Sequence, residues 1–244
     1  MSERPGDSHF SNVAWRSWRS WRFNSGAWQA ARAVFVRDWH GEWRTRAALN
    51  SALLFAVAAP LALSFNVANQ KLAPETLGGA LWSVLLFAAL VGLSRAFIKE
   101  EESGTAALLK LSAPPEAVLW GKMAFNLALL ALTQIAAVPI FIVLLNAQVE
   151  SPSVLLATLI LGDVGLAATS TLLGAMAAQA RARGALFSAI AVPVLLPLLV
   201  TASAATSTAF GARGDANLAL VAIAAYDAAM LAAAWMLFDF VWSA

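Results

Sequence analysis

Residues 123–145 read MAFNLALLALTQIAAVPIFIVLL, an unbroken run without a single charged side chain. A helix needs roughly 20 mostly apolar residues to cross the hydrocarbon core of a bilayer. This run is long enough and apolar enough to do so. Pro139 lies inside it. Neighbouring helices and hydroxyl groups can satisfy the carbonyl that a proline frees, so we expect a kink there and not a break.

Five further mostly apolar runs of similar length lie on both sides of this one. None of them alternates with a period of two, which is the pattern of an outer-membrane β-barrel. The sequence therefore predicts an all-α fold, a polytopic membrane protein with six transmembrane helices. The five additional runs are 47–67, 77–97, 154–178, 185–205 and 218–240.

The composition supports a membrane protein and excludes several other classes. The chain has 244 residues, of which 60% are hydrophobic and 12% charged, against about 45–50% and 25% in soluble domains. A soluble protein of this size has too much surface to hide so many apolar side chains. Disordered chains contain far fewer apolar residues than this sequence, so that class is excluded as well. Cysteine is absent, which excludes disulfides, thiolate nucleophiles and Cys-ligated zinc or iron–sulfur sites. No secretory signal is visible in residues 1–46, so we expect the first run to remain a span.

The basic residues predict the orientation. Fourteen of the 16 Lys and Arg residues lie in segments that the six-span scheme places on one side: eight before residue 47, four at 95–122, and two near 181–183. Lys71 and Arg213 lie on the other side. Because loops rich in Lys and Arg stay in the cytoplasm, both termini are predicted to be cytoplasmic.

Three regions follow from this scheme: a basic, Trp-rich tail (1–26), an amphipathic interfacial helix (27–46), and the six-helix domain (47–241). The tail repeats Trp and Arg at residues 15–22. Trp prefers the headgroup layer and Arg pairs with anionic lipid, so we predict contact with membrane lipid rather than with nucleic acid; simple disorder is the remaining alternative. Arg37 and Asp38 have the helical spacing to join Glu42, Arg44 and Arg46 in ion pairs.

The segment 98–122, between the second and third runs, has features of a short helix. Three acids, residues 100–102, precede Ser103 and Thr105, and either hydroxyl could cap a helix. The pair at 114–115 is Pro-Pro, which ends a helix. Such a helix has a ridge of leucines that the membrane surface or another protein must cover. We predict this segment to be a coupling loop, with Glu100, Glu102, Gly104, Thr105, Leu108, Leu109 and Leu111 as its contact residues.

The order of these residues resembles a known family. Two acids, Gly104-Thr105, Leu108-Leu109, then Ser and Pro, then Gly121-Lys122 are similar to permease subunits of ABC transporters. The closer resemblance is to the CcmB family, the haem exporter B subunit of cytochrome c maturation. Residues 37–44, 161–183 and 192–197 resemble that family's N-terminal elbow, its fourth span with the inner loop, and its fifth span.

The resemblance implies a membrane subunit that couples ATP hydrolysis by a separate subunit to haem export or to release of a haem-loaded chaperone. The implied partners are a CcmA-like cytoplasmic ATPase, a CcmC-like haem-handling subunit and a small CcmD-like membrane subunit. Haem is then handled by the complex, and this chain binds no cofactor itself. An ABC permease for another substrate and a non-transporting membrane scaffold are the alternatives.

The residues themselves indicate no enzyme. The sequence has no P-loop motif, so any ATP must be bound by a partner subunit. Its two histidines, His9 and His40, precede the first span, and no catalytic or metal-ligating set is predicted. Asp163 and Asp227 are the acids deep inside spans. Such residues face protein or water, either as a proton or substrate contact or in an interhelical hydrogen bond to a hydroxyl such as that of Thr169 or Ser170.

Overall fold

The computed structural model describes residues 25–67, 71–102, 113–178 and 183–243. These ranges form seven α-helices, and no strand occurs within them. The helices are α2 (Ser25–Thr45), α3 (Ala47–Asn66), α4 (Pro74–Glu102), α6 (Pro115–Leu144), α7 (Pro152–Ala178), α8 (Arg183–Ala209) and α9 (Ala216–Ser243).

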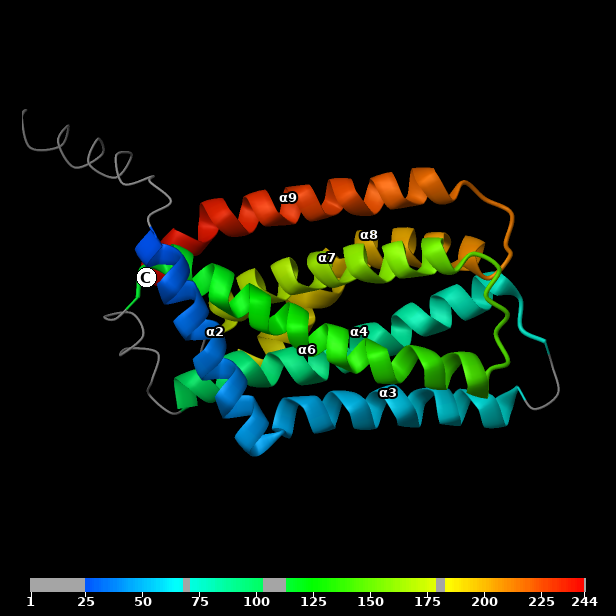
Figure 1. Cartoon of the computed structure of the whole chain (residues 1–244), viewed down its shortest axis with the longest axis horizontal. Coiled ribbons are helices and arrows are strands. Elements are labelled where there is room, and N and C mark those ends of the chain that lie inside the picture. The colour runs from blue at the N-terminus through cyan, green and yellow to red at the C-terminus, as the bar shows by residue number, and fades with distance from the viewer. Residues whose placement is uncertain (1–24, 68–70, 103–112, 179–182, 244) are drawn as a thin grey trace, which may run out of the picture.

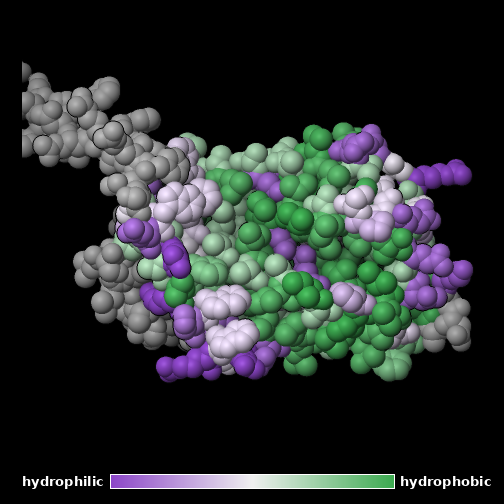
Figure 2. Space-filling view, in the orientation of Figure 1, coloured by the Kyte–Doolittle hydropathy of each residue, from purple (hydrophilic) through white to green (hydrophobic). Residues whose placement is uncertain are grey.

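Six of the helices form a bundle in which successive helices run in opposite directions (Figure 1). Within the described residues, α3, α4, α6, α7, α8 and α9 are each long and apolar enough to cross a membrane. The prediction of six membrane-spanning helices in an all-α fold is therefore confirmed. Apolar side chains cover the middle of the bundle, and polar ones gather toward its two ends (Figure 2).

Helix α2 lies across one end of the bundle, here called the α2 end, where the C-terminus also lies (Figure 1). Arg46 separates α2 from α3 in the left-handed conformation, with φ 51°. The carboxylate of Glu42 accepts hydrogen bonds from the backbone N–H groups of Ala48 and Leu49, at 2.8 and 2.9 Å. It thereby satisfies N–H groups that the first turn of a helix leaves without partners.

Helix α2 also packs closely on α6. At Gly121 a Cβ atom would lie 2.7 Å from both the carbonyl oxygen of Ala31 and the Cβ of Val34, so the glycine allows the two helices to approach. Lys122 is buried and lies 3.5 Å from Asp38, which also pairs with Arg37. Asp38 therefore pairs with the adjacent Arg37 and with Lys122 of another helix, and not at the helical spacing that we expected, whereas Glu42, which we expected in an ion pair, caps the backbone of α3.

Two helices extend beyond the predicted spans. Helix α4 continues to Glu102 and α6 begins at Pro115, where the predicted spans end at residue 97 and begin at 123. Residues 93–102 contain neither Gly nor Pro, so nothing local ends α4 at the membrane boundary. Proline is well suited to the first position of a helix, and Pro115 occupies it in α6.

Candidate functional site

The centre of the bundle contains buried polar side chains, many of them on α7. This helix packs against α4, α6, α8 and α9. Its sequence includes small residues that allow close packing and polar residues that need partners. The buried polar residues of α7 are Thr158, Asp163, Thr169, Ser170 and Thr171.

Asp163 is held by an amide from another helix. The Nε2 atom of Gln134 on α6 donates a hydrogen bond to its Oδ1 at 2.6 Å, and both side chains are buried. The interhelical hydrogen bond that we considered for Asp163 is therefore present, but its donor is an amide and not a hydroxyl. Sequence analysis did not single out Gln134, although an amide inside a membrane span is itself a signal of interhelical bonding.

Asp227 has a different environment. It is buried on α9, and neither of its carboxylate oxygens has a hydrogen-bond partner within the described residues. A Cβ atom built on Gly165 of α7 would lie 2.5 Å from its Oδ1, so the carboxyl group sits against this glycine. Gly165 follows Asp163 by two residues, about 3 Å along a helix. The two acids thus lie at nearly the same level, as their equal distances from the span ends predict.

The hydroxyls near these acids bond to other groups. The Tyr226 hydroxyl lies 2.9 Å from the Thr169 hydroxyl and donates to the carbonyl of Val194 at 3.1 Å, which joins α9 to α7 and α8. Asn126 of α6 donates to the Thr171 hydroxyl at 2.9 Å. The Thr169 hydroxyl is therefore hydrogen-bonded to Tyr226 and not to either acid.

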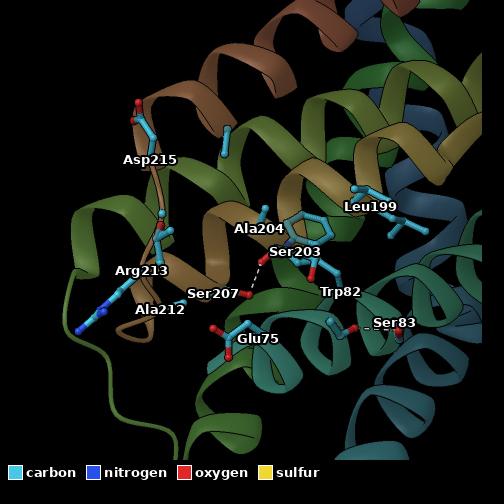
Figure 3. Close-up of a pocket in the computed structure, with 15 residues that line it drawn as sticks. Glu75, Trp82, Ser83, Leu199, Ser203, Ala204, Ser207, Ala212, Arg213 and Asp215 are labelled. Carbon is cyan, nitrogen blue, oxygen red and sulfur yellow. Dashed lines mark hydrogen bonds between the residues drawn. The ribbon is translucent and has the colours of Figure 1, made fainter. Parts of the chain in front are cut away.

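A pocket of about 520 Å³ opens at the end of the bundle opposite α2. It lies between the start of α4, the end of α8 and the start of α9 (Figure 3). Glu75, Arg213 and Asp215 contribute charged groups, and Ser203 and Ser207 contribute hydroxyls. No sequence pattern pointed to this pocket, because the start of α4 is distant in the chain from the connection between α8 and α9.

Trp82 separates the pocket from the buried polar layer. It lines the pocket, and its ring packs against Gly162 so closely that a Cβ there would lie 2.0 Å from it. Its indole N–H donates to the Thr206 hydroxyl at 2.8 Å. One aromatic side chain thus forms a wall of the pocket and contacts the helix that carries Asp163.

The predicted coupling loop is described only at its two edges. Glu100 and Glu102 belong to the last turn of α4, so they continue the helix of the second span. Gly104, Thr105, Leu108, Leu109 and Leu111 lie outside the described residues. The Trp-rich tail 1–24 does as well.

The fold and the buried site define a class: a polytopic helical membrane protein whose six spans enclose a polar interior. Within the described residues, no cluster of three or more His, Asp or Glu side chains could hold a metal ion. The sequence also lacks a nucleotide-binding loop. The geometry is that of packed membrane-spanning helices.

Comparison with known proteins gives the family. The model of the CcmB protein family matches residues 29–243, and the chain belongs to that family. A protein of Rhodobacter capsulatus named heme exporter protein B is 28% identical over 171 residues, which cover 69% of this chain and 78% of the relative. A Bradyrhizobium diazoefficiens protein of the same name is 27% identical over 179 residues, 72% of this chain and 81% of the relative. No solved structure matches the chain.

Proposed function

We propose that this protein is the membrane subunit of an ABC-type complex for cytochrome c biogenesis and acts in haem export. The family match over residues 29–243 carries this proposal, and both relatives are named heme exporter protein B. The six-helix bundle supplies the membrane domain that such a subunit needs. Because the chain has no P-loop, the ATPase must be another chain.

The finer mechanism that we propose is coupling. ATP hydrolysis by a CcmA-like subunit would drive haem export or the release of a haem-loaded chaperone. A CcmC-like subunit would handle the haem, and a small CcmD-like subunit would complete the complex. The end of α4 and the segment that follows it are the proposed contact with the ATPase, because together they combine Glu100 and Glu102 with Leu108, Leu109 and Leu111.

We propose an inner-membrane location with both termini in the cytoplasm. The distribution of Lys and Arg supports this orientation, and α2 and the C-terminus share one end of the bundle (Figure 1). Reporter fusions after residues 70, 148 and 212 should then score periplasmic. A cytoplasmic score at any of the three would reject this topology.

The function is tested by complementation. A strain without this gene should lose haem-stained c-type cytochromes, and the wild-type gene should restore them. Production of the apocytochrome should be unchanged, since the defect lies in haem delivery. Normal c-type cytochromes in the deletion strain, with no second copy of the gene, would reject the proposal.

A further inference from the structure

Asp227 is an acid enclosed by apolar groups from two other helices. Its side chain lies between α9, which carries it, and the facing surfaces of α7 and α8. A Cβ built on Gly165 would lie 2.5 Å from Oδ1 of Asp227 and 2.9 Å from a methyl group of Leu198. The residue is only 4% exposed, and both carboxylate oxygens lack hydrogen-bond partners within the described residues. The carboxyl group therefore fills a closed space that offers it no donor.

The only Lys, Arg or His on the three helices α7, α8 and α9 is Arg183, the first residue of α8, which lies 15 residues before Leu198 and therefore about 22 Å away along the helix. Residues 152–178, 184–209 and 216–243 contain no Lys, Arg or His. Leu198 faces Asp227 from α8 and Gly165 faces it from α7. The adjacent Tyr226 directs its hydroxyl to Thr169 and to the carbonyl of Val194.

Asp163, the other acid at this level, offers the carboxylate of Asp227 neither a positive charge nor a hydrogen-bond donor when it is ionised. Asp163 lies on α7, two residues before Gly165, and its Oδ1 accepts the hydrogen bond of Gln134 from α6. Residues two apart in a helix point about 200° away from each other, so Asp163 faces α6 while Gly165 faces Asp227. A buried charge without a partner is strongly unfavourable, whereas the neutral acid avoids most of that cost.

We propose that Asp227 is a proton-binding site in the interior of the bundle. It holds a proton while α9 packs on α7 as in this structure, and it releases the proton only when this contact opens to water. Proton binding is then linked to the α7–α9 contact: loss of the proton favours separation of the two helices, and separation favours loss of the proton. This inference goes beyond the proposed function and does not depend on it.

The first test measures folding stability against pH in the full-length protein, purified in detergent. Asp227→Asn has nearly the same shape but cannot be charged. Because the folded state binds the proton more tightly than the unfolded state, wild type should lose thermal stability relative to Asp227→Asn as pH rises, and the two should converge at low pH. Asp227→Leu should abolish the same pH dependence, which keeps the test valid if the amide itself impairs folding.

The matched control is Asp239→Asn, which removes an exposed acid from the same helix. Wild type should not lose stability relative to this variant as pH rises. The proposal is overturned if the difference between wild type and Asp227→Asn does not change with pH. It is also overturned if wild type gains relative stability as pH rises, since that would mean that the folded protein stabilises the carboxylate.

The second test detects the proton chemically. Dicyclohexylcarbodiimide is an apolar reagent that modifies protonated carboxyl groups, and peptide mass spectrometry locates the modified residue. We expect modification of Asp227 that decreases as pH rises, is absent in Asp227→Asn and persists in Asp163→Asn. Modification at Asp227 that increases with pH would contradict the proposal, and so would equal labelling of this peptide in wild type and Asp227→Asn.

Discussion

Helices α7 and α3 are both apolar enough to span a membrane, yet the bundle uses them differently. In the 18-residue apolar stretch that marks each helix as a possible span, 61% is buried in α7 and 22% is buried in α3. Helix α7 carries Gly162 and Gly165 against Trp82 and Asp227, while α3 exposes Leu54 and Phe65. Hydropathy finds the spans, but small and polar residues determine which span is central, because in lipid an apolar side chain gains little from burial.

The largest effect should come from filling the closest contact of α7. Gly162→Ala places a Cβ 2.0 Å from the Trp82 ring, and that ring is buried and bonded to Thr206, so it cannot easily withdraw. We expect a loss of about 1–3 kcal/mol in the free energy of unfolding, the usual cost of overpacking. Thermal unfolding in detergent, followed by Trp fluorescence, measures it.

Gly79→Ala is the matched control for this substitution. Gly79 also lies in a spanning helix, but its added Cβ would lie 3.6 Å from the nearest atom, the Ser203 hydroxyl. An alanine in open helix is neutral or slightly stabilising. Equal losses in the two variants would mean that α7 is no more tightly packed than α4.

The next effect tests the polar bond of α7. A double-mutant cycle of Gln134→Leu and Asp163→Leu should give a coupling energy of about 0.6–1.7 kcal/mol, the range of interhelical hydrogen bonds in membranes. The single variant Gln134→Leu should be less stable than the double variant, since it leaves a buried carboxyl group without its donor. A coupling energy of zero would remove Asp163 from the contacts that hold α7.

A smaller effect is expected at the start of α3, where Glu42 caps the helix. Glu42→Ala should cost about 1 kcal/mol, as the loss of a helix cap does. Glu42→Gln keeps an acceptor oxygen and should retain most of the stability. If both variants are as stable as wild type, the Glu42 cap does not stabilise α3.

The smallest effect belongs to the exposed face of α3. Leu54 is 72% exposed, so Leu54→Ala should change the free energy of unfolding by less than about 0.5 kcal/mol. A loss as large as that of Gly162→Ala, measured in the same assay on the assembled complex, would show that another subunit covers this face of α3.

The sequence was enough to find the six helices, because each carries about 20 apolar residues that no other class of fold explains. It was not enough to find their ends. Residues 115–122 are helical but not apolar enough to be counted with the span, and the prediction began α6 at Met123.

The site was only half accessible from sequence. Asp163 and Asp227 could be identified because acids inside spans are costly. The different surroundings of the two acids could not be predicted. Gln134 lies 29 residues from Asp163 in the sequence, and only the rotation and packing of α6 against α7 bring these two side chains together. The pocket near Trp82 likewise depends on how the starts of α4 and α9 pack beside the end of α8.

The central claim is that this membrane bundle works with a separate ATPase, and co-purification tests it most directly. The tagged protein is solubilised in mild detergent, and its partners are identified by mass spectrometry. We expect a P-loop ATPase to co-purify with wild type and with Leu54→Ala. In the double variant Leu108→Ala, Leu109→Ala the affinity for the ATPase should fall about 10- to 100-fold per leucine, if each leucine contributes about 1–3 kcal/mol to the contact. Wild type that restores c-type cytochromes but purifies without any ATPase would contradict the account.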